Sequence, residues 1–260
     1  PMDPTFQLIG GGPRGSMGDT MSWIVAILAC IAIVAFILYN RRRRVNYGFP
    51  LRPVWAEVLI GAVGCGLVLI AVWIANSYPW PRGLARQYAE EQGIVEPEGG
   101  LIIAHGIANP VIIMIGVALV VAFIANRRRF GRYVYAIGGN PEAAVLSGIN
   151  TRWTIVKVFV LMGVLAGVAS AIITARLNAA TNGTGELAEL QVIAAAVIGG
   201  TSLSGGVGTI IGAVLGALVM QSLKNGMGLM GVDAPMQNIV VGVVLVLAVG
   251  LDAFYRRRAE

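Results

Sequence analysis

The sequence predicts an all-α protein, a polytopic bundle of transmembrane helices with one short cytoplasmic helix, from three observations. Hydrophobic residues make up 57% of the 260 residues, charged residues only 12%, and the mean hydropathy is +0.77. This composition is too apolar for a surface exposed to water. Long runs carry no charge, and Lys and Arg gather between these runs, as they do beside membrane spans.

The uninterrupted apolar runs lie, in order, at Met21–Tyr39, Val54–Ala75, Leu101–Ala125, Trp153–Leu177 and Asn238–Tyr255. Each approaches or exceeds the roughly 20 residues that an α-helix needs to cross a hydrocarbon core. Each is therefore predicted to be a transmembrane helix.

The stretch between the fourth and the last of these spans is interrupted by "GGTSLSGGVGT", Gly199–Thr209. We expect two crossings, Leu187–Leu203 and Val207–Leu223, joined by a cytoplasmic turn at this interruption. A re-entrant hairpin is the alternative, because non-helical backbone at membrane depth must be buried in protein or line a wet cavity. The sequence leaves the two alternatives open.

The basic clusters predict the orientation, because cytoplasmic loops carry the excess of Lys and Arg. Arg41–Arg44, Arg127–Arg129 and Arg256–Arg258 are expected inside, and the glutamate-rich segment Arg82–Glu98 outside. The net charge of +6 is thus divided among loops that flank spans. Membrane lipid, and not nucleic acid, is the expected partner of these clusters.

The beginning of the chain, "PMDPTFQLIGGGPRG", reads as a Gly- and Pro-rich loop without the pattern of a signal peptide. If Arg41–Arg44 are inside, the first span enters from outside, so at least one crossing should precede Pro1. Residues 1–260 are therefore expected to be a single transmembrane domain that lacks its N-terminal spans. The number of those spans cannot be read from the sequence.

Small residues predict where helices pack closely. Gly208, Gly212 and Gly216 are four residues apart, and this spacing lets helix backbones approach within a membrane. Gly163 and Gly167 repeat the spacing.

Groups for catalysis or metal binding are sparse. The chain has no phosphate-binding loop of the GxxxxGK[ST] type, and its one histidine, His105, has no partner at ligand spacing. The cysteines, Cys30 and Cys65, both fall within predicted spans. We expect no enzyme, no metal and no cofactor.

Two groups of polar residues are candidates for a substrate path. His105 and Asn109 are four residues apart and would share one face of the third span, where they either line a polar path or form an internal hydrogen bond near Pro110. Asn178, Asn182 and Gln191 lie near the outer end of the fourth span. Their amides could meet a hydroxyl-rich solute.

The stretch "GGNPEAAVLSGIN", Gly138–Asn150, is predicted to be a short cytoplasmic helix between two spans. Asn140 is a favourable N-cap, Pro141 suits the first helical position, and Gly148 can end the helix. A helix this short needs a partner surface, to which it would present Ala143, Ala144 and Leu146.

This stretch resembles the cytoplasmic coupling loop of permease subunits in bacterial ATP-binding cassette (ABC) importers. "VIGGTSLSGGVGTIIGAVLGAL" and "NIVVGVVLVLAVGLD" resemble the C-terminal half of the permease branch that transports monosaccharides and branched-chain amino acids. Upstream, "GFPLRPVWAEV", "NSYPWPRGLARQYAE" and "NAATNGTGEL" are most similar to xylose permeases.

The resemblance implies a multi-pass permease of the bacterial inner membrane that moves a monosaccharide, xylose in particular. It implies three partners: a cytoplasmic ATPase on a separate subunit, a periplasmic sugar-binding protein and a second permease copy. By resemblance, Glu142, Ala143, Ala144 and Gly148 occupy the ATPase-coupling positions. No sugar-contacting residue carries over, and no motif here decides between pentose and hexose.

A secondary transporter or channel for a small polar solute is the alternative function. Ion or proton coupling should require ionisable groups at mid-membrane depth, and the middles of the predicted spans offer essentially none. A membrane enzyme is the third possibility, and the lack of a catalytic constellation disfavours it.

Overall fold

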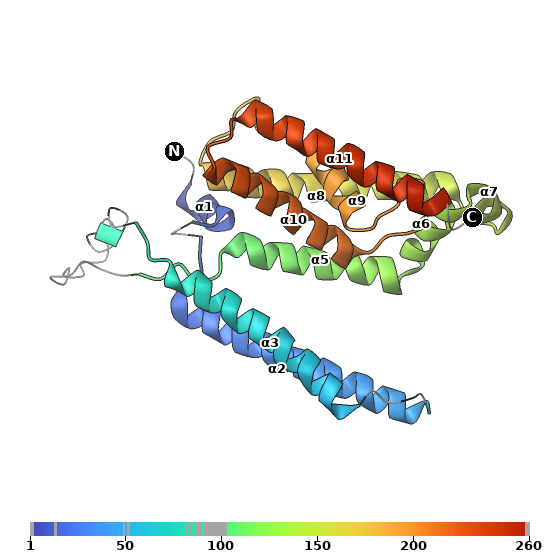
Figure 1. The fold of residues 1–260 in the computed structure, drawn as a ribbon, viewed down its shortest axis with the longest axis horizontal. Helices are drawn as coiled ribbons and strands as arrows, with labels where there is room; N and C mark the ends of the chain where they lie inside the picture. The colour runs from blue at the N-terminus through green and yellow to red at the C-terminus, as the bar shows by residue number, and fades with distance from the viewer. Residues whose placement is uncertain are drawn as a thin grey trace. The chain divides into compact units, whose positions relative to one another are not determined.

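The computed structural model describes residues 3–12, 15–48, 50, 53–81, 83, 85, 86, 90 and 103–257. These residues are mainly helical (Figure 1), which confirms the all-α fold class. The chain divides into two compact units, Pro1–Ile112 with Ala171–Ala179, and Ile113–Ser170 with Ala180–Glu260.

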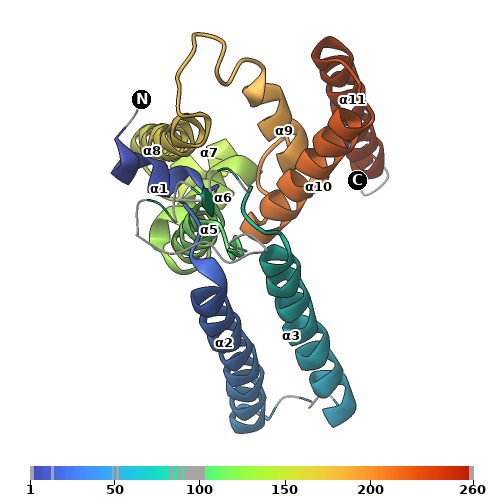
Figure 2. The ribbon, with the colours of Figure 1, turned by 90° about the vertical axis from the view of Figure 1, so that its left-hand side faces the viewer.

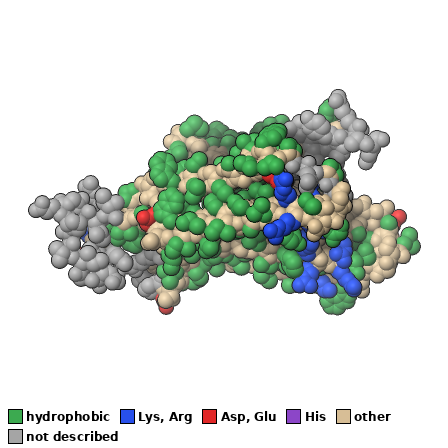
Figure 3. All heavy atoms as spheres, turned by 90° about the horizontal axis from the view of Figure 1, so that it is seen from below, with side chains coloured by type: hydrophobic (Ala, Val, Ile, Leu, Met, Phe, Trp, Pro, Cys, Tyr) green, Lys and Arg blue, Asp and Glu red, His purple; other side chains and the backbone are tan. Residues whose placement is uncertain are grey.

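Five of the described helices are long and apolar enough to cross a membrane: α2 (Gly18–Asn46), α3 (Val54–Ser77), α5 (Asn109–Arg127), α8 (Thr151–Leu177) and α10 (Ile210–Leu229). Many of their large apolar side chains, such as Leu119 and Phe159, are exposed. Hydrophobic side chains are spread widely over the face that Figure 3 shows. Such a surface suits contact with lipid.

In the first unit, α2 and α3 pack against each other as a helical hairpin. Arg41 near the end of α2 forms an ion pair of 2.6 Å with Glu57 in the first turn of α3. Cys30 and Cys65 face each other at mid-length, each Sγ lying 3.9 Å from the carbonyl oxygen of the other residue. Both cysteines are free thiols.

The N-terminal stretch that we expected to be a loop contains a helix, α1 (Pro4–Gly10). Asp3 is its N-cap, and its carboxylate accepts hydrogen bonds from the backbone N–H and the hydroxyl of Thr5, at 2.9 and 2.6 Å. These bonds hold the pKa of Asp3 below its ordinary value. The Asp-Pro pair is a helix-start signal, and we missed it in a Gly- and Pro-rich context.

The helix of the third span begins at Asn109, later than the expected Leu101, and residues 103–108 are not helical. Extended residues near Pro79 and Ala104 pair, and Trp80 N–H donates to the carbonyl of Ile103 at 2.8 Å. The fully buried Ser22 donates to the carbonyl of Gly18 at 2.6 Å, and its oxygen accepts from the backbone N–H of Ile107 at 2.8 Å. Several backbone groups of this segment are thus hydrogen-bonded without a helix.

The second unit contains α9 (Ala188–Ile198), α10 and α11 (Ala234–Arg257), which pack together (Figure 2). Its buried cluster consists of Ala194 and Ala195 from α9, Met220 from α10 and Val241 from α11. The small alanines of α9 allow the neighbouring helices to approach it closely.

The expected crossing Leu187–Leu203 is wrong in length, since α9 has 11 residues. At about 1.5 Å per residue it measures roughly 16 Å, about half of the ~30 Å hydrocarbon core. A left-handed Leu187 (φ 59°) precedes it, and residues 199–209 follow it without helix. The alternative of a re-entrant hairpin accommodates a helix of this length, whereas one full helical crossing does not.

Two glycines of the predicted packing face lie directly against α9. A Cβ at Gly212 would collide with the carbonyl of Gly199, and a Cβ at Gly216 with the carbonyl of Ala195. Gly208 lies outside the helix, before the N-cap Thr209, and a Cβ on it would lie 3.0 Å from the Thr201 side chain. Gly163 and Gly167 have no described atom within 4 Å of an added Cβ.

We expect Gly216→Val to destabilise the second unit and Gly226→Val to leave it nearly unchanged. Valine at 216 would push against main chain, at a cost of about 1–3 kcal/mol or more, whereas a Cβ at Gly226 meets nothing within 4 Å. Both glycines lie in α10, so the change in helix propensity is matched. Thermal stability of the detergent-purified protein measures the difference, and equal losses would mean that the α9–α10 contact is not close.

Candidate coupling site

The second unit contains a helix that the sequence analysis missed, α6 (Arg129–Gly139), directly after α5. Its less exposed residues recur every three or four positions, at Phe130, Val134 and Ile137, while Arg132 and Tyr133 are exposed. This periodicity is typical of an amphipathic helix. We overlooked it because the preceding arginines read as the end of a span.

The predicted short helix is α7 (Pro141–Leu146), which is shorter than the expected range Gly138–Asn150. Its capping is as predicted: the Asn140 side chain accepts from the backbone N–H of Ala143 at 2.9 Å, and Pro141 follows at the first helical position. Glu142 lies in the first turn, where the helix dipole favours an acid.

The end of α7 is fixed by Gly148, which has a φ of +77°. Its N–H donates to the carbonyl of Val145 at 2.9 Å, and the N–H of Ile149 donates to the carbonyl of Ala144 at 3.1 Å. This pair of bonds satisfies the last carbonyls of the helix in the Schellman arrangement. A side chain at Gly148 would be strained in this conformation.

Ala144 does not lie on the exposed side of α7, where we expected it together with Ala143 and Leu146. Ala144 is buried within the chain itself, at 4% exposure, and α7 packs against α6. Leu146 is 89% exposed and Val145 is 56% exposed, while Glu142 and Ala143 are also exposed. Ala144 therefore packs inward, and Leu146 offers the largest apolar contact to another molecule.

The end of α6 contacts the glycine-rich loop 199–209 main chain to main chain. A Cβ at Gly138 would collide with the backbone nitrogen of Gly206, and a Cβ at Gly205 would lie 2.6 Å from the carbonyl oxygen of Gly138. Gly139, the next residue, has no described atom within 4 Å of an added Cβ. The sequence signal for this contact was the presence of two Gly-Gly pairs, 138–139 and 205–206, which we did not predict to lie against each other.

A hydrogen bond reinforces the same contact. The Tyr135 hydroxyl on α6 donates to the carbonyl of Gly208 at 3.0 Å. The next residue, Thr209, caps α10 by accepting from the N–H of Gly212 at 3.0 Å. The end of α6 is thus bonded to the residue that precedes the N-cap of α10.

The loop itself is held by its own polar groups. Ser202 is buried at 6% exposure, and its N–H donates to the carbonyl of Val207 at 2.9 Å. The hydroxyls of Ser202 and Ser204 lie 2.8 Å apart. These bonds link residues from different parts of the loop to one another.

Two residues of the predicted substrate path are engaged by α1 in the first unit. The Asn109 side chain donates to the carbonyl of Leu8 at 2.7 Å, and the Asn178 side chain accepts from Gln7 at 3.1 Å. A Cβ at Gly10 would lie 2.7 Å from the carbonyl oxygen of Ala175, so α1 also packs against the end of α8. These amides take part in structural contacts.

His105 and Asn109 do not share a helical face, contrary to expectation. His105 lies in the extended segment before α5, and Asn109 is the first residue of the helix. The backbone N–H of His105 donates to the carbonyl of Tyr78 at 3.1 Å, and its ring stands edge-on to Trp80 at 6.3 Å. Among the described residues, its buried Nδ1 has no hydrogen-bond partner.

Asn182 and Gln191 belong to the second unit. Asn182 is exposed in the turns before α9, where the hydroxyls of Thr181 and Thr184 lie 2.9 Å apart. Gln191 is half-buried on α9. In the described part of the chain, no group of three or more His, Cys, Asp and Glu residues could hold a metal ion.

Comparison with known proteins gives one family match and several relatives. The family described as "Branched-chain amino acid transport system / permease component" matches residues 16–249. The xylose transport system permease protein of Escherichia coli K12 is 39% identical over 258 residues, which is 99% of this chain and 59% of that protein. No solved structure matches the chain.

Two further relatives bear on the substrate. The xylose transport system permease protein of Haemophilus influenzae is 36% identical over 99% of this chain and 61% of its own length. The ribose import permease protein of Bacillus subtilis is 44% identical over 147 residues, which is 56% of this chain and 46% of that protein. The chain thus spans less than two thirds of the length of each of these relatives.

Proposed function

Because the chain belongs to the family of branched-chain amino acid transport system permease components, we propose that it is membrane-spanning permease sequence of an ABC importer for a monosaccharide. The five apolar spans among its described residues and this membership place it in the bacterial inner membrane as a multi-pass protein. Family members of this kind are transport subunits and not enzymes. The single observation that carries the proposal is the similarity to xylose permeases along 99% of the chain.

The partners follow from the same proposal. A separate cytoplasmic ATPase would supply the energy, a periplasmic protein would deliver the sugar, and a second permease copy would complete the path. Residues 1–260 would belong to one transmembrane permease domain.

The coupling role is assigned to α7 and the residues that shape it. Glu142, Ala143 and Leu146 on its exposed side would contact the ATPase. Ala144 would seat α7 on α6, and Gly148 would end the helix. The buried Ala144 and the left-handed Gly148 support these two positioning roles.

The substrate path is proposed at the polar residues near the outer ends of the spans. Asn182 and Gln191 of the second unit have the better support, because Asn109 and Asn178 bond to α1. His105 retains one nitrogen without a described partner and stays a candidate. Amides of this kind match the hydroxyl groups of a sugar.

Xylose is the proposed sugar, and ribose is the second candidate. The xylose relatives align with 99% of this chain, whereas the ribose relative reaches a higher identity, 44%, over 56% of it. The xylose relatives thus align with nearly all of this chain, whereas the ribose relative aligns with only part of it.

The test is uptake of radiolabelled xylose by a bacterial strain that lacks its own xylose and ribose importers. The native gene product containing this chain is expressed with its ATPase and its sugar-binding protein. We expect ATP-dependent xylose accumulation at least tenfold over the empty strain and less ribose accumulation. Accumulation of ribose without xylose would reassign the sugar, and uptake of neither sugar would contradict the proposed function.

A further inference from the structure

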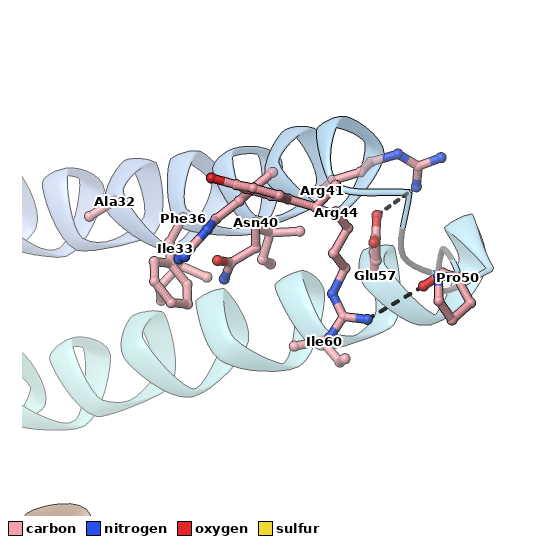
Figure 4. A pocket seen from close by; sticks show the side chains of 12 residues that line it. Ala32, Ile33, Phe36, Asn40, Arg41, Arg44, Pro50, Glu57 and Ile60 are labelled. Carbon is pink, nitrogen blue, oxygen red and sulfur yellow. Dashed lines mark hydrogen bonds and ion pairs between the residues drawn. The ribbon is translucent and has the colours of Figure 1, made fainter. Parts of the chain in front are cut away.

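The hairpin of α2 and α3 carries an open cavity of about 1090 Å³ near the end where the two helices connect (Figure 4). We propose that this cavity is a binding site for one anionic phospholipid of the cytoplasmic leaflet. The proposal does not depend on which solute the protein transports.

The lining of the cavity changes from apolar to basic along α2. The apolar part is formed by Ala32, Ile33, Phe36 and Ile37 of α2 with Ile60 of α3. The polar part follows one to three turns later, with Asn40, Arg41, Arg43, Arg44 and Tyr47. Positions 33, 37, 40 and 44 recur at helical spacing, so they form one stripe along the helix.

The dimensions match one leaflet. From Ile33 to Arg44 is 11 residue steps, about 16 Å at 1.5 Å per residue. Half of a ~30 Å hydrocarbon core is about 15 Å. An acyl chain lying along Ile33 and Phe36 would therefore bring its phosphate to the level of the arginines.

The charges favour an anionic headgroup. Glu57 is the single carboxylate among the described residues that line the cavity, and Arg41 already pairs with it at 2.6 Å. Arg44 donates to the carbonyl of Pro50 at 3.5 Å, a long bond, and Arg43 stacks on the Tyr47 ring at 5.8 Å. Two positive charges thus remain uncompensated by a described carboxylate at the end that the positive-inside rule places in the cytoplasm.

A lipid fits this combination better than a soluble anion does. A free phosphate would use the arginines but leave the apolar part of the cavity beside Phe36 and Ile60 unfilled, whereas the acyl chains of a lipid would pack against these side chains. Arg presents a planar fork of donors that matches the oxygens of a phosphate group. Basic pockets between helices on the cytoplasmic side are suited to anionic headgroups.

The experiment titrates dioleoyl phosphatidylglycerol into the detergent-purified native gene product and counts bound lipid by native mass spectrometry. We expect one tightly bound phosphatidylglycerol, and dioleoyl phosphatidylcholine bound at least tenfold more weakly. Arg44→Gln should weaken binding about fivefold, and Arg43→Gln with Arg44→Gln about 25-fold, from the usual contribution of a basic residue near an anionic membrane surface.

Arg42→Gln is the matched control, because Arg42 lies between the lining arginines but does not line the cavity. It should bind lipid as the unmodified protein does. Equal weakening by Arg42→Gln and Arg44→Gln would reduce the effect to general surface charge and overturn the proposal. So would equal binding of the two lipids, or displacement of the lipid by millimolar inorganic phosphate, which would indicate a simple anion site. Failure of the unmodified protein to bind the lipid would equally overturn it.

Discussion

Leu146→Asp is expected to abolish stable association with the ATPase subunit while leaving the protein folded in the membrane. Leu146 is 89% exposed at the end of α7, and an exposed apolar side chain contributes hydrophobic free energy to binding when a partner covers it. Burying a carboxylate in its place would cost about 2–4 kcal/mol, or about 30- to 1,000-fold in affinity. Co-purification of the ATPase with tagged protein measures the loss.

The matched control is Leu229→Asp, since Leu229 is 91% exposed at the other end of the second unit's helices, where α10 ends. It should retain the ATPase, and Leu146→Met should retain it as well. Undiminished co-purification by Leu146→Asp would remove the docking role from α7. Ala144→Arg is less informative, because Ala144 is buried within the chain and its replacement would disturb α7 itself.

Gly138→Val is expected to lower both sugar uptake and the stimulation of ATP hydrolysis by sugar, without loss of ATPase association. The valine would separate α6 from loop 199–209, because its side chain would meet the backbone of Gly206. The exposed side of α7 would remain available to the ATPase. We expect sugar-stimulated ATP hydrolysis in proteoliposomes, and sugar uptake, to fall at least tenfold, since a close backbone contact cannot yield to a side chain without displacement.

Gly139→Val is the control on the adjacent residue, where an added Cβ meets nothing within 4 Å. It should transport nearly as well as the unmodified protein. Tyr135→Phe removes only the hydroxyl that bonds to Gly208, a loss of about 1 kcal/mol, and should give a milder defect of the same kind. If Gly138→Val and Gly139→Val behave alike, the contact between α6 and the loop does not transmit motion.

The apolar runs were sufficient to locate most spans, because a helix in lipid must satisfy its own backbone groups and cannot be shorter than the core it crosses. The predicted start of the third span was wrong because backbone groups there form hydrogen bonds outside a helix. Residues 103–108 bond to Tyr78, Trp80 and Ser22 from elsewhere in the chain, and such partners leave no periodicity in the local sequence.

The sequence predicted the residues that cap α7, but it did not predict which residues of the candidate coupling site contact each other. Asn140, Pro141 and Gly148 act within a few residues of their own positions, so their roles follow from local rules. Whether Ala144 or Leu146 points outward depends on α6, whose packing is a tertiary property. The contact between Gly138 and Gly206 joins residues 68 positions apart in the numbering, and no local pattern could specify it.

The contact between Gly138 and the loop glycines also limits how the gene can change. Every missense mutation of a glycine codon adds a side chain, so each residue of this contact can only become larger. A substitution at Gly138 cannot be compensated by a smaller residue opposite it, because Gly205 and Gly206 are already glycine and the colliding atoms are main chain. A second mutation that restores function would therefore have to reposition the whole loop, through Ser202 or through the cap of α10 at Thr209. A larger residue on one side of the contact cannot be balanced by a smaller residue on the other side.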